Sequence, residues 1–181
     1  APRCALLSNG TYCLAVSEAG QSFARWHALS VCRRGTRADP AAGPVVRLET
    51  DDFSGPLLPG TAAGAQWRFT VRAAQFSTRH GSVTAVQTFT VPERVNGEVR
   101  ALTLSSPDGI DGTLRLTFEA VLAPWEDYVN HPAFARLGFQ SVLRRNALLL
   151  RRLGRGGKPE TWLCAVCDRQ ADFYAEGAIP G

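Results

Sequence analysis

The sequence predicts an all-β protein, a sandwich of strands with one short helical element. Apolar and polar residues alternate with a period of two through most of the chain, and this period favours strands over helices. Short apolar runs are separated at regular intervals by Gly, Asn, Asp and Pro, as is typical of sandwiches. The 181 residues fit a single domain, 1–181, that is long enough to bury one sizeable core.

Turn residues divide the first half of the chain into predicted strands. Asn9-Gly10 is a strong hairpin signal and predicts a strand over residues 11–16. A longer strand is predicted over residues 23–33, in which Arg25 and Trp26 point to opposite faces. The pattern predicts further strands over residues 45–50, 66–73, 75–79 and 82–91.

The second half continues the same pattern. Strands are predicted over residues 98–105 and 113–122, separated by the turn 107–112. Asp108 and Asp111 in that turn lack the spacing and closing glutamate of a calcium loop, so we interpret them as turn residues. One short helix is expected between Pro124 and Leu137. Returning strands are predicted over residues 139–143, 147–151 and 162–168.

Composition and cysteine usage point to a cytoplasmic protein with no role at a membrane. No apolar run approaches the roughly 20 residues that span a bilayer, and the first residues lack the pattern of a secretory signal. The five cysteines are an odd number, so we expect free thiols and no disulfide. Cys164 and Cys167 have the spacing of half a zinc site or a redox pair, but no second pair completes it. We interpret both as small buried hydrophobes.

The net charge of +4 does not identify a nucleic-acid-binding protein. The chain contains one local basic cluster, but no aromatic platform is interleaved with it. We therefore interpret the cluster as a solvated hairpin or as an interface to another domain. Its members are Arg144, Arg145, Arg151, Arg152, Arg155 and Lys158.

No constellation of catalytic or metal-binding residues stands out. Glycosidic cleavage usually needs two flanking carboxyl groups, but the adjacent pairs Glu126-Asp127 and Asp51-Asp52 diverge in an extended chain or sit in a turn. The histidines have no metal-site spacing, and neither a nucleophile elbow nor a phosphate-binding loop is present. We predict no catalytic residue, no metal and no cofactor.

Two separated groups of motifs carry a family resemblance. The first is Ser8-Asn9-Gly10-Thr11-Tyr12, followed by Glu18-Ala19-Gly20 and Arg25-Trp26. The second is Leu122-Ala123-Pro124, followed by His131-Pro132-Ala133-Phe134. In this order and at this separation the chain resembles the amino-terminal β-sandwich of the cellobiose phosphorylase group, the former glycosyltransferase family 36. That group includes chitobiose phosphorylase and cyclic β-1,2-glucan synthases.

The resemblance implies a two-sheet antiparallel super-sandwich of the galactose mutarotase-like type, whose catalytic partner is an (α/α) barrel of the same polypeptide. The chain contains no such barrel and no methionine, so we expect it to be one non-catalytic domain of a longer enzyme. The resemblance implies that this domain supports the barrel, mediates homodimer contacts and shapes the sugar site. We expect carbohydrate or domain-docking residues among Trp125, Tyr128, His131, Phe134, Arg25 and Trp26. An exposed apolar docking patch is expected from Trp125, Tyr128, Phe134, Leu137 and Phe139.

Two alternatives remain at this point. One is a stand-alone carbohydrate-binding sandwich, in which Trp26, Trp67, Trp125, Trp162 or Tyr128 stack on sugar rings. An exposed row of two or three of these rings would favour it. The other is an independent enzyme of mutarotase type, which needs a histidine and a carboxylate converging in one cleft.

Overall fold

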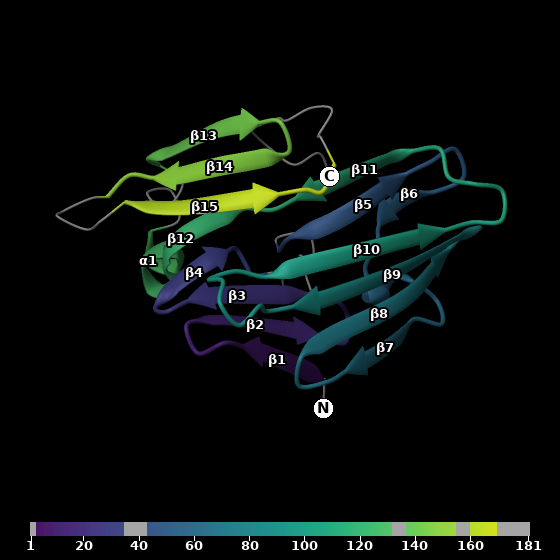
Figure 1. The fold of residues 1–181 in the computed structure, drawn as a ribbon, viewed down its shortest axis with the longest axis horizontal. Coiled ribbons are helices and arrows are strands. Elements are labelled where there is room, and N and C mark those ends of the chain that lie inside the picture. The colour runs from purple at the N-terminus through teal and green to yellow at the C-terminus, as the bar shows by residue number, and fades with distance from the viewer. Residues whose placement is uncertain (1–2, 35–42, 132–136, 155–159, 170–181) are drawn as a thin grey trace. The chain divides into compact units, whose positions relative to one another are not determined.

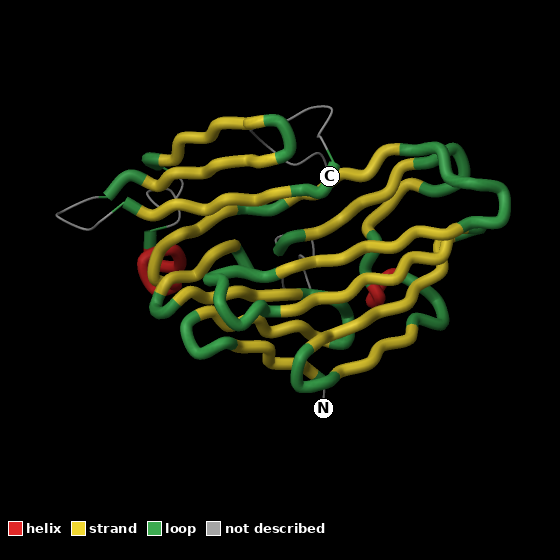
Figure 2. The backbone as a smooth tube through the Cα atoms, viewed as in Figure 1, coloured by secondary structure: helices red, strands yellow, loops and turns green. Residues whose placement is uncertain are grey.

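The computed structural model describes residues 3–34, 43–131, 137–154 and 160–169 (Figures 1 and 2). Strands account for 56% and helical residues for 6%, so the predicted all-β class is confirmed. The chain divides into two compact units, residues 1–120 and 121–181, and each is described by itself. No helix in the described ranges has the length and apolar character needed to cross a bilayer.

The first unit contains β1 to β11 and one 3₁₀ helix. Its strands are β1 (Cys4–Ser8), β2 (Tyr12–Ser17), β3 (Ser22–Trp26), β4 (Leu29–Cys32), β5 (Val45–Glu49), β6 (Ser54–Pro56), β7 (Gln66–Phe69), β8 (Ala73–His80), β9 (Val83–Thr90), β10 (Val99–Ser105) and β11 (Thr113–Thr117). The 3₁₀ helix is η2 (Pro59–Thr61).

Strands β1 to β4 are consecutive antiparallel neighbours. In β2 every second residue is buried, namely Tyr12, Leu14 and Val16. The intervening side chains are half-buried. Because successive strand residues point to opposite faces, this alternation gives the sheet one face toward the core.

A second antiparallel sheet runs in the order β10-β9-β8-β7. Its core face carries edge-to-face aromatic pairs, with Phe76 between Phe69 and Phe89 at centroid distances of 5.8 and 5.7 Å. Strands β11, β5 and β6 form a third sheet. Leu48 of β5 and Leu57 after β6 form a buried cluster with Val83 and Ala85 of β9, so the second and third sheets share a core.

The predicted long strand over residues 23–33 is wrong, because the structure has a hairpin there. β3 ends at Trp26 and β4 begins at Leu29, and these two residues are paired. His27 in the turn has φ of 51°, a left-handed conformation that is uncommon outside glycine and in which Asn, Asp and His are enriched among the other residues. The His27 backbone N–H donates to the Thr11 carbonyl at 2.9 Å, which ties this turn to the preceding one. No Gly, Asn or Pro marks the turn in the sequence.

The predicted strand over residues 113–122 is also interrupted. β11 ends at Thr117, and β12 (Ala120–Pro124) begins only after Phe118 and Glu119. The break is held by the Arg33 backbone N–H, which donates to the Glu119 carbonyl at 2.7 Å. The Arg33 guanidinium also pairs with the Glu119 carboxylate at 3.3 Å. Alternation of side chains alone could not reveal this long-range contact.

The second unit contains the end of β12, one helix and a three-stranded antiparallel sheet. The helix is α1 (Trp125–Asn130), which confirms the predicted short helical element. The sheet runs in the order β13 (Phe139–Arg144), β14 (Ala147–Arg152) and β15 (Thr161–Val166). Val121, Ala123 and Tyr128 form a buried cluster with Trp125 packed against it.

Gly20 occupies a turn that only glycine fits. Its φ is +79°, and an added Cβ atom would lie 2.4 Å from Cδ of Pro59. The neighbouring Ala19 carbonyl accepts a hydrogen bond from the Gly60 backbone N–H at 3.3 Å. The Glu18-Ala19-Gly20 segment therefore packs its backbone directly against η2.

We predict that Gly20→Ala destabilises the chain by about 3 kcal/mol, because positive φ and overpacking both oppose the methyl group. Gly64→Ala is the matched control, since Gly64 has φ of +68° but nothing lies within 4 Å of its added Cβ. The control should lose only about 1 kcal/mol. Urea unfolding followed by tryptophan fluorescence measures both. Equal losses in the two variants would show that the close approach to Pro59 is unimportant.

His80 is buried at 5% exposure, packs on Phe53 with a centroid distance of 4.7 Å and hydrogen-bonds to the Thr78 hydroxyl at 3.0 Å. Burial lowers the pKa of its imidazole below the ordinary value of 6.5. The unfolded chain therefore binds more protons than the folded chain below about pH 6.5, and folding stability falls as the pH drops through that window. Urea unfolding between pH 7.5 and 5 should show this slope.

The slope should be smaller in His80→Gln, because the replacement removes the buried imidazole. A slope that is the same in the native chain and in His80→Gln would assign the pH dependence to other groups.

Candidate functional site

The Ser8-Asn9-Gly10-Thr11-Tyr12 motif forms a polar clamp in the first unit. The side-chain oxygen of Asn9 accepts hydrogen bonds from the backbone N–H groups of Thr11 and Tyr12 at 3.1 and 2.8 Å. Its side-chain nitrogen donates to the carbonyls of Pro92 and Val95, both at 2.8 Å. One amide group thus shapes the β1–β2 turn and holds it against the loop between β9 and β10.

Tyr12 extends the clamp into the interior. Its hydroxyl donates to Glu98 Oε2 at 2.9 Å. Arg100 donates from Nε to Glu98 Oε1 at 2.5 Å and from Nη2 to the Ser22 hydroxyl at 2.9 Å. The guanidinium also lies over the Phe89 ring, 5.0 Å from its centroid. The Glu98 carboxylate is therefore matched by a cation and by hydrogen bonds, as a part-buried charge requires.

This polar cluster is unsuited to acid–base chemistry. Burial, followed by the charge of Glu98, raises the pKa of the Tyr12 hydroxyl above its ordinary value. The same causes in the same order raise the pKa of the Cys32 thiol to about 12. Both groups therefore stay protonated at neutral pH, and Cys32 is no reactive thiolate. The role that this geometry supports is holding β2, β3 and β10 together.

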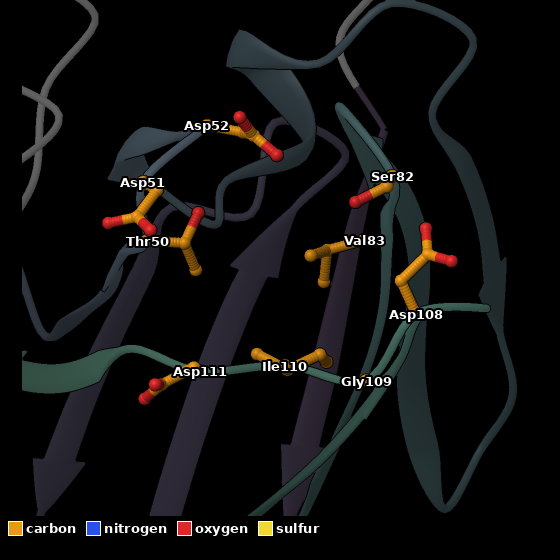
Figure 3. Close-up of a pocket in the computed structure, with 9 residues that line it drawn as sticks. All are labelled: Thr50, Asp51, Asp52, Ser82, Val83, Asp108, Gly109, Ile110 and Asp111. Carbon is orange, nitrogen blue, oxygen red and sulfur yellow. The ribbon is translucent and has the colours of Figure 1, made fainter.

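An acid-rimmed pocket of about 210 Å³ lies elsewhere in the first unit (Figure 3). Its rim carries Asp51, Asp52, Asp108 and Asp111, all exposed. In Figure 3 the four carboxylates point in different directions and do not converge on one point. No three His, Cys, Asp or Glu side chains of the described residues are close enough to hold a metal ion. The geometry offers neither a flanking acid pair nor a metal cage.

The structure brings only some of the sequence-predicted site residues together. Arg25 is exposed and Trp26 half-buried, on opposite faces of β3. Trp125 stacks on Tyr128 with a centroid distance of 5.4 Å. His131 is exposed at the end of α1, and Phe134 lies outside the described residues.

One residue of the predicted apolar patch, Tyr128, is buried instead of exposed. Tyr128 is only 7% exposed and belongs to the buried cluster with Val121 and Ala123. It packs inside the second unit because the short α1 helix turns that side toward β12. Leu137 is exposed at 53%, whereas Trp125 and Phe139 are half-buried.

The interpretation of Cys164 and Cys167 as buried hydrophobes is wrong, since both are exposed. In β15 the face that carries Leu163 and Ala165 is half-buried, and Cys164 lies on the exposed face. Cys32 is buried, and all five cysteines are free.

Of the aromatic rings considered for sugar stacking, Trp26, Trp67 and Trp125 are half-buried, and Trp162 alone is largely exposed, at 58%. The exposed row of rings that would favour a stand-alone carbohydrate-binding sandwich is therefore absent among these residues. The sequence did not point to the polar neighbours of Trp162, which are Gln140, Arg151 and Glu160. The pairing of β14 with β15 places Arg151 opposite Trp162, so a prediction of this strand pairing could have identified these neighbours.

Comparison with known families shows to which family the chain belongs. A family model described as "Glycosyl hydrolase 94, supersandwich domain" matches residues 1–176. The chain belongs to the glycosyl hydrolase 94 supersandwich family. A search of curated proteins gives no match. The predicted resemblance to the amino-terminal sandwich of the cellobiose and chitobiose phosphorylase group is thereby confirmed.

In this glycosyl hydrolase 94 supersandwich domain, we predict that Asn9→Ala destabilises the chain by about 2–3 kcal/mol, because four hydrogen bonds to backbone groups are lost and two carbonyls lose their donor. Asn96→Ala is the control, since Asn96 is exposed and accepts one hydrogen bond, from the Thr11 hydroxyl at 2.7 Å. It should lose less than about 1 kcal/mol. Urea unfolding measures both. Comparable stability of the two variants would contradict the clamp.

Proposed function

We propose that this chain is a non-catalytic domain of a carbohydrate-active enzyme of the glycoside phosphorylase or β-glucan synthase type. In this proposal it supports a helical catalytic barrel, contributes to oligomer contacts and shapes the sugar site. The observation that carries the proposal is the supersandwich family match over residues 1–176. A fold alone does not establish an activity, so the proposal also rests on the side-chain geometry.

The geometry of the described residues agrees with a supporting role. Glycoside cleavage needs two carboxyl groups on either side of the scissile bond, roughly 5–10 Å apart and facing it. The carboxylates at the acid-rimmed pocket diverge instead (Figure 3). The part-buried Glu98 is engaged by Tyr12 and Arg100. These polar residues stabilise the sandwich and leave no acid pair facing a cleft.

The barrel-docking region is proposed around the end of α1. His131 and Val129 are exposed there, and Leu137 is exposed at 53%. Exposed apolar side chains next to a helix end are the kind of surface that a second domain covers. Trp125 and Phe134 remain candidates for this contact or for a sugar contact, and Arg25 and Trp26 remain separate candidates on the first unit. The proposal retains a cytoplasmic setting, for which reduced thiols are the normal state.

We predict that the purified 181-residue chain releases no glucose 1-phosphate from cellobiose or sophorose with inorganic phosphate, and no glucose without phosphate. The reason is that no facing acid pair is built from its described residues. A family member that carries a helical barrel serves as the positive control in the same coupled assay. Turnover that scales with the concentration of the chain and survives repeated purification would contradict the proposal.

A further inference from the structure

One row of side chains crosses the three-stranded sheet of the second unit. Gln140 of β13 is paired with Arg151 of β14, and Arg151 is paired with Trp162 of β15. Residues that are directly opposite in register share one face of a sheet. The row lies at one end of the sheet, because Gln140 and Trp162 are the second residues of their strands and Arg151 is the last but one of β14.

These side chains are held to one another. The Arg151 guanidinium lies 5.4 Å from the centroid of the Trp162 ring. Its Nε donates to Glu160 Oε2 at 2.9 Å, and its Nη2 makes a second bond to Glu160 Oε1. Its Nη1 donates to Gln140 Oε1 at 3.4 Å. We call Trp162, Arg151, Glu160 and Gln140 the Trp162 platform.

A single exposed tryptophan does not by itself indicate a binding site, because isolated apolar side chains are common on protein surfaces. The platform differs because an indole that is 58% exposed stands beside three polar side chains that are already oriented. Their order lowers the conformational entropy that a ligand would otherwise have to remove on binding. The core of this sheet is on its other face, where Leu150 is 8% exposed.

We propose that the Trp162 platform binds a neutral saccharide, whose C–H face stacks on the indole. The flat apolar face of a pyranose ring matches an aromatic surface, and its hydroxyls can both donate and accept hydrogen bonds. Glu160 offers acceptors, Arg151 offers donors and the Gln140 amide offers both. The proposal rests on the proposed function for the choice of carbohydrate as the ligand class.

The charges on the platform favour a neutral ligand. Arg151 and Glu160 carry one positive and one negative charge, and their direct bond leaves the platform without net charge. The hydrogen bond from Arg151 holds the pKa of the Glu160 carboxyl below its usual range, so this balance persists at neutral pH. Nucleic acids and anionic glycans bind through unmatched cations that neutralise their phosphates or sulfates. The platform offers no such cation.

The position of the row favours a saccharide over a protein partner. Protein interfaces place their aromatic and arginine anchors near the centre, within a ring of flanking contacts. Here the next rows on this face, Val142–Leu149–Cys164 and then Arg144–Ala147–Val166, lie to one side only, and the platform is the last row of the sheet. An edge position leaves the indole open to a chain of sugar units.

The test uses the 181-residue chain and four variants: Trp162→Ala, Trp162→Phe, Gln140→Ala and the control Val142→Ala. Val142 is exposed on the same face, one row away. The probes are cellotetraose and barley β-glucan as neutral glucans, dextran as a neutral glucan of other geometry, and heparin as an anionic chain. Binding is followed by tryptophan fluorescence with cellotetraose and by affinity electrophoresis with the polymers. Thermal unfolding confirms that each variant is folded.

We expect the native chain to bind at least one neutral glucan and not heparin. Removal of the indole in Trp162→Ala should weaken binding about tenfold, as loss of an aromatic stacking contact does. Trp162→Phe should keep part of the affinity, Gln140→Ala should lose several-fold, and Val142→Ala should match the native chain.

Three results would overturn the proposal: no binding of any neutral glucan, undiminished binding in Trp162→Ala, or preferential binding of heparin. A change of sedimentation coefficient in Trp162→Ala, with glucan binding intact, would assign the face to a protein contact instead. None of these outcomes bears on the phosphorolysis assay, which tests the proposed function separately.

Discussion

The first unit depends on one polar clamp, the Asn9 side chain between the β1–β2 turn and the loop that joins β9 to β10. These two segments are separated by more than 80 residues, so nothing local holds them together. Asn9 uses both ends of its amide, accepting from its own turn and donating to the distant loop. The Asn side chain has two N–H donors and a separate acceptor oxygen, whereas the shorter Ser hydroxyl has only one donor. Tyr12, Glu98 and Arg100 continue the connection inward, so the registers of the two hairpins are fixed relative to each other.

This clamp gives the Ser8-Asn9-Gly10-Thr11-Tyr12 motif a structural role. Part-buried polar groups stabilise a fold only when every member is satisfied, and a partly satisfied network is costly. Such a network therefore restricts which residues can stand at its positions. Gly20 is restricted for a different reason, because its backbone conformation and its distance from Pro59 both exclude a side chain. The Ser-Asn-Gly-x-Tyr and Glu-Ala-Gly segments are best understood as constraints on assembly of the sandwich.

Alternation and turn chemistry predicted the fold class, the Asn9-Gly10 turn and the short helix near Pro124, because these are local properties. They did not predict where strands end when the end is set by a distant partner. Glu119 interrupts a regular pattern because it pairs with Arg33, and the turn at His27 is held by the Thr11 carbonyl. The exposure of Cys164 and the burial of Tyr128 were also not predicted, because they depend on which face of each element a partner covers. Periodicity shows that two faces exist, but the packing partner decides which face is covered.

The Trp162 platform could not be found by composition either, since its members come from three strands and become neighbours only through register. The two faces of this sheet carry different side chains. The covered face carries Leu150, Leu163 and Ala165, whereas the open face carries Gln140, Arg151 and Trp162. Substitutions on the open face leave the core contacts in place, so the residues beside Trp162 can change with the sugar to be bound while the sheet persists. The Asn9 clamp has no such freedom, because each of its atoms is already engaged in holding the sandwich together.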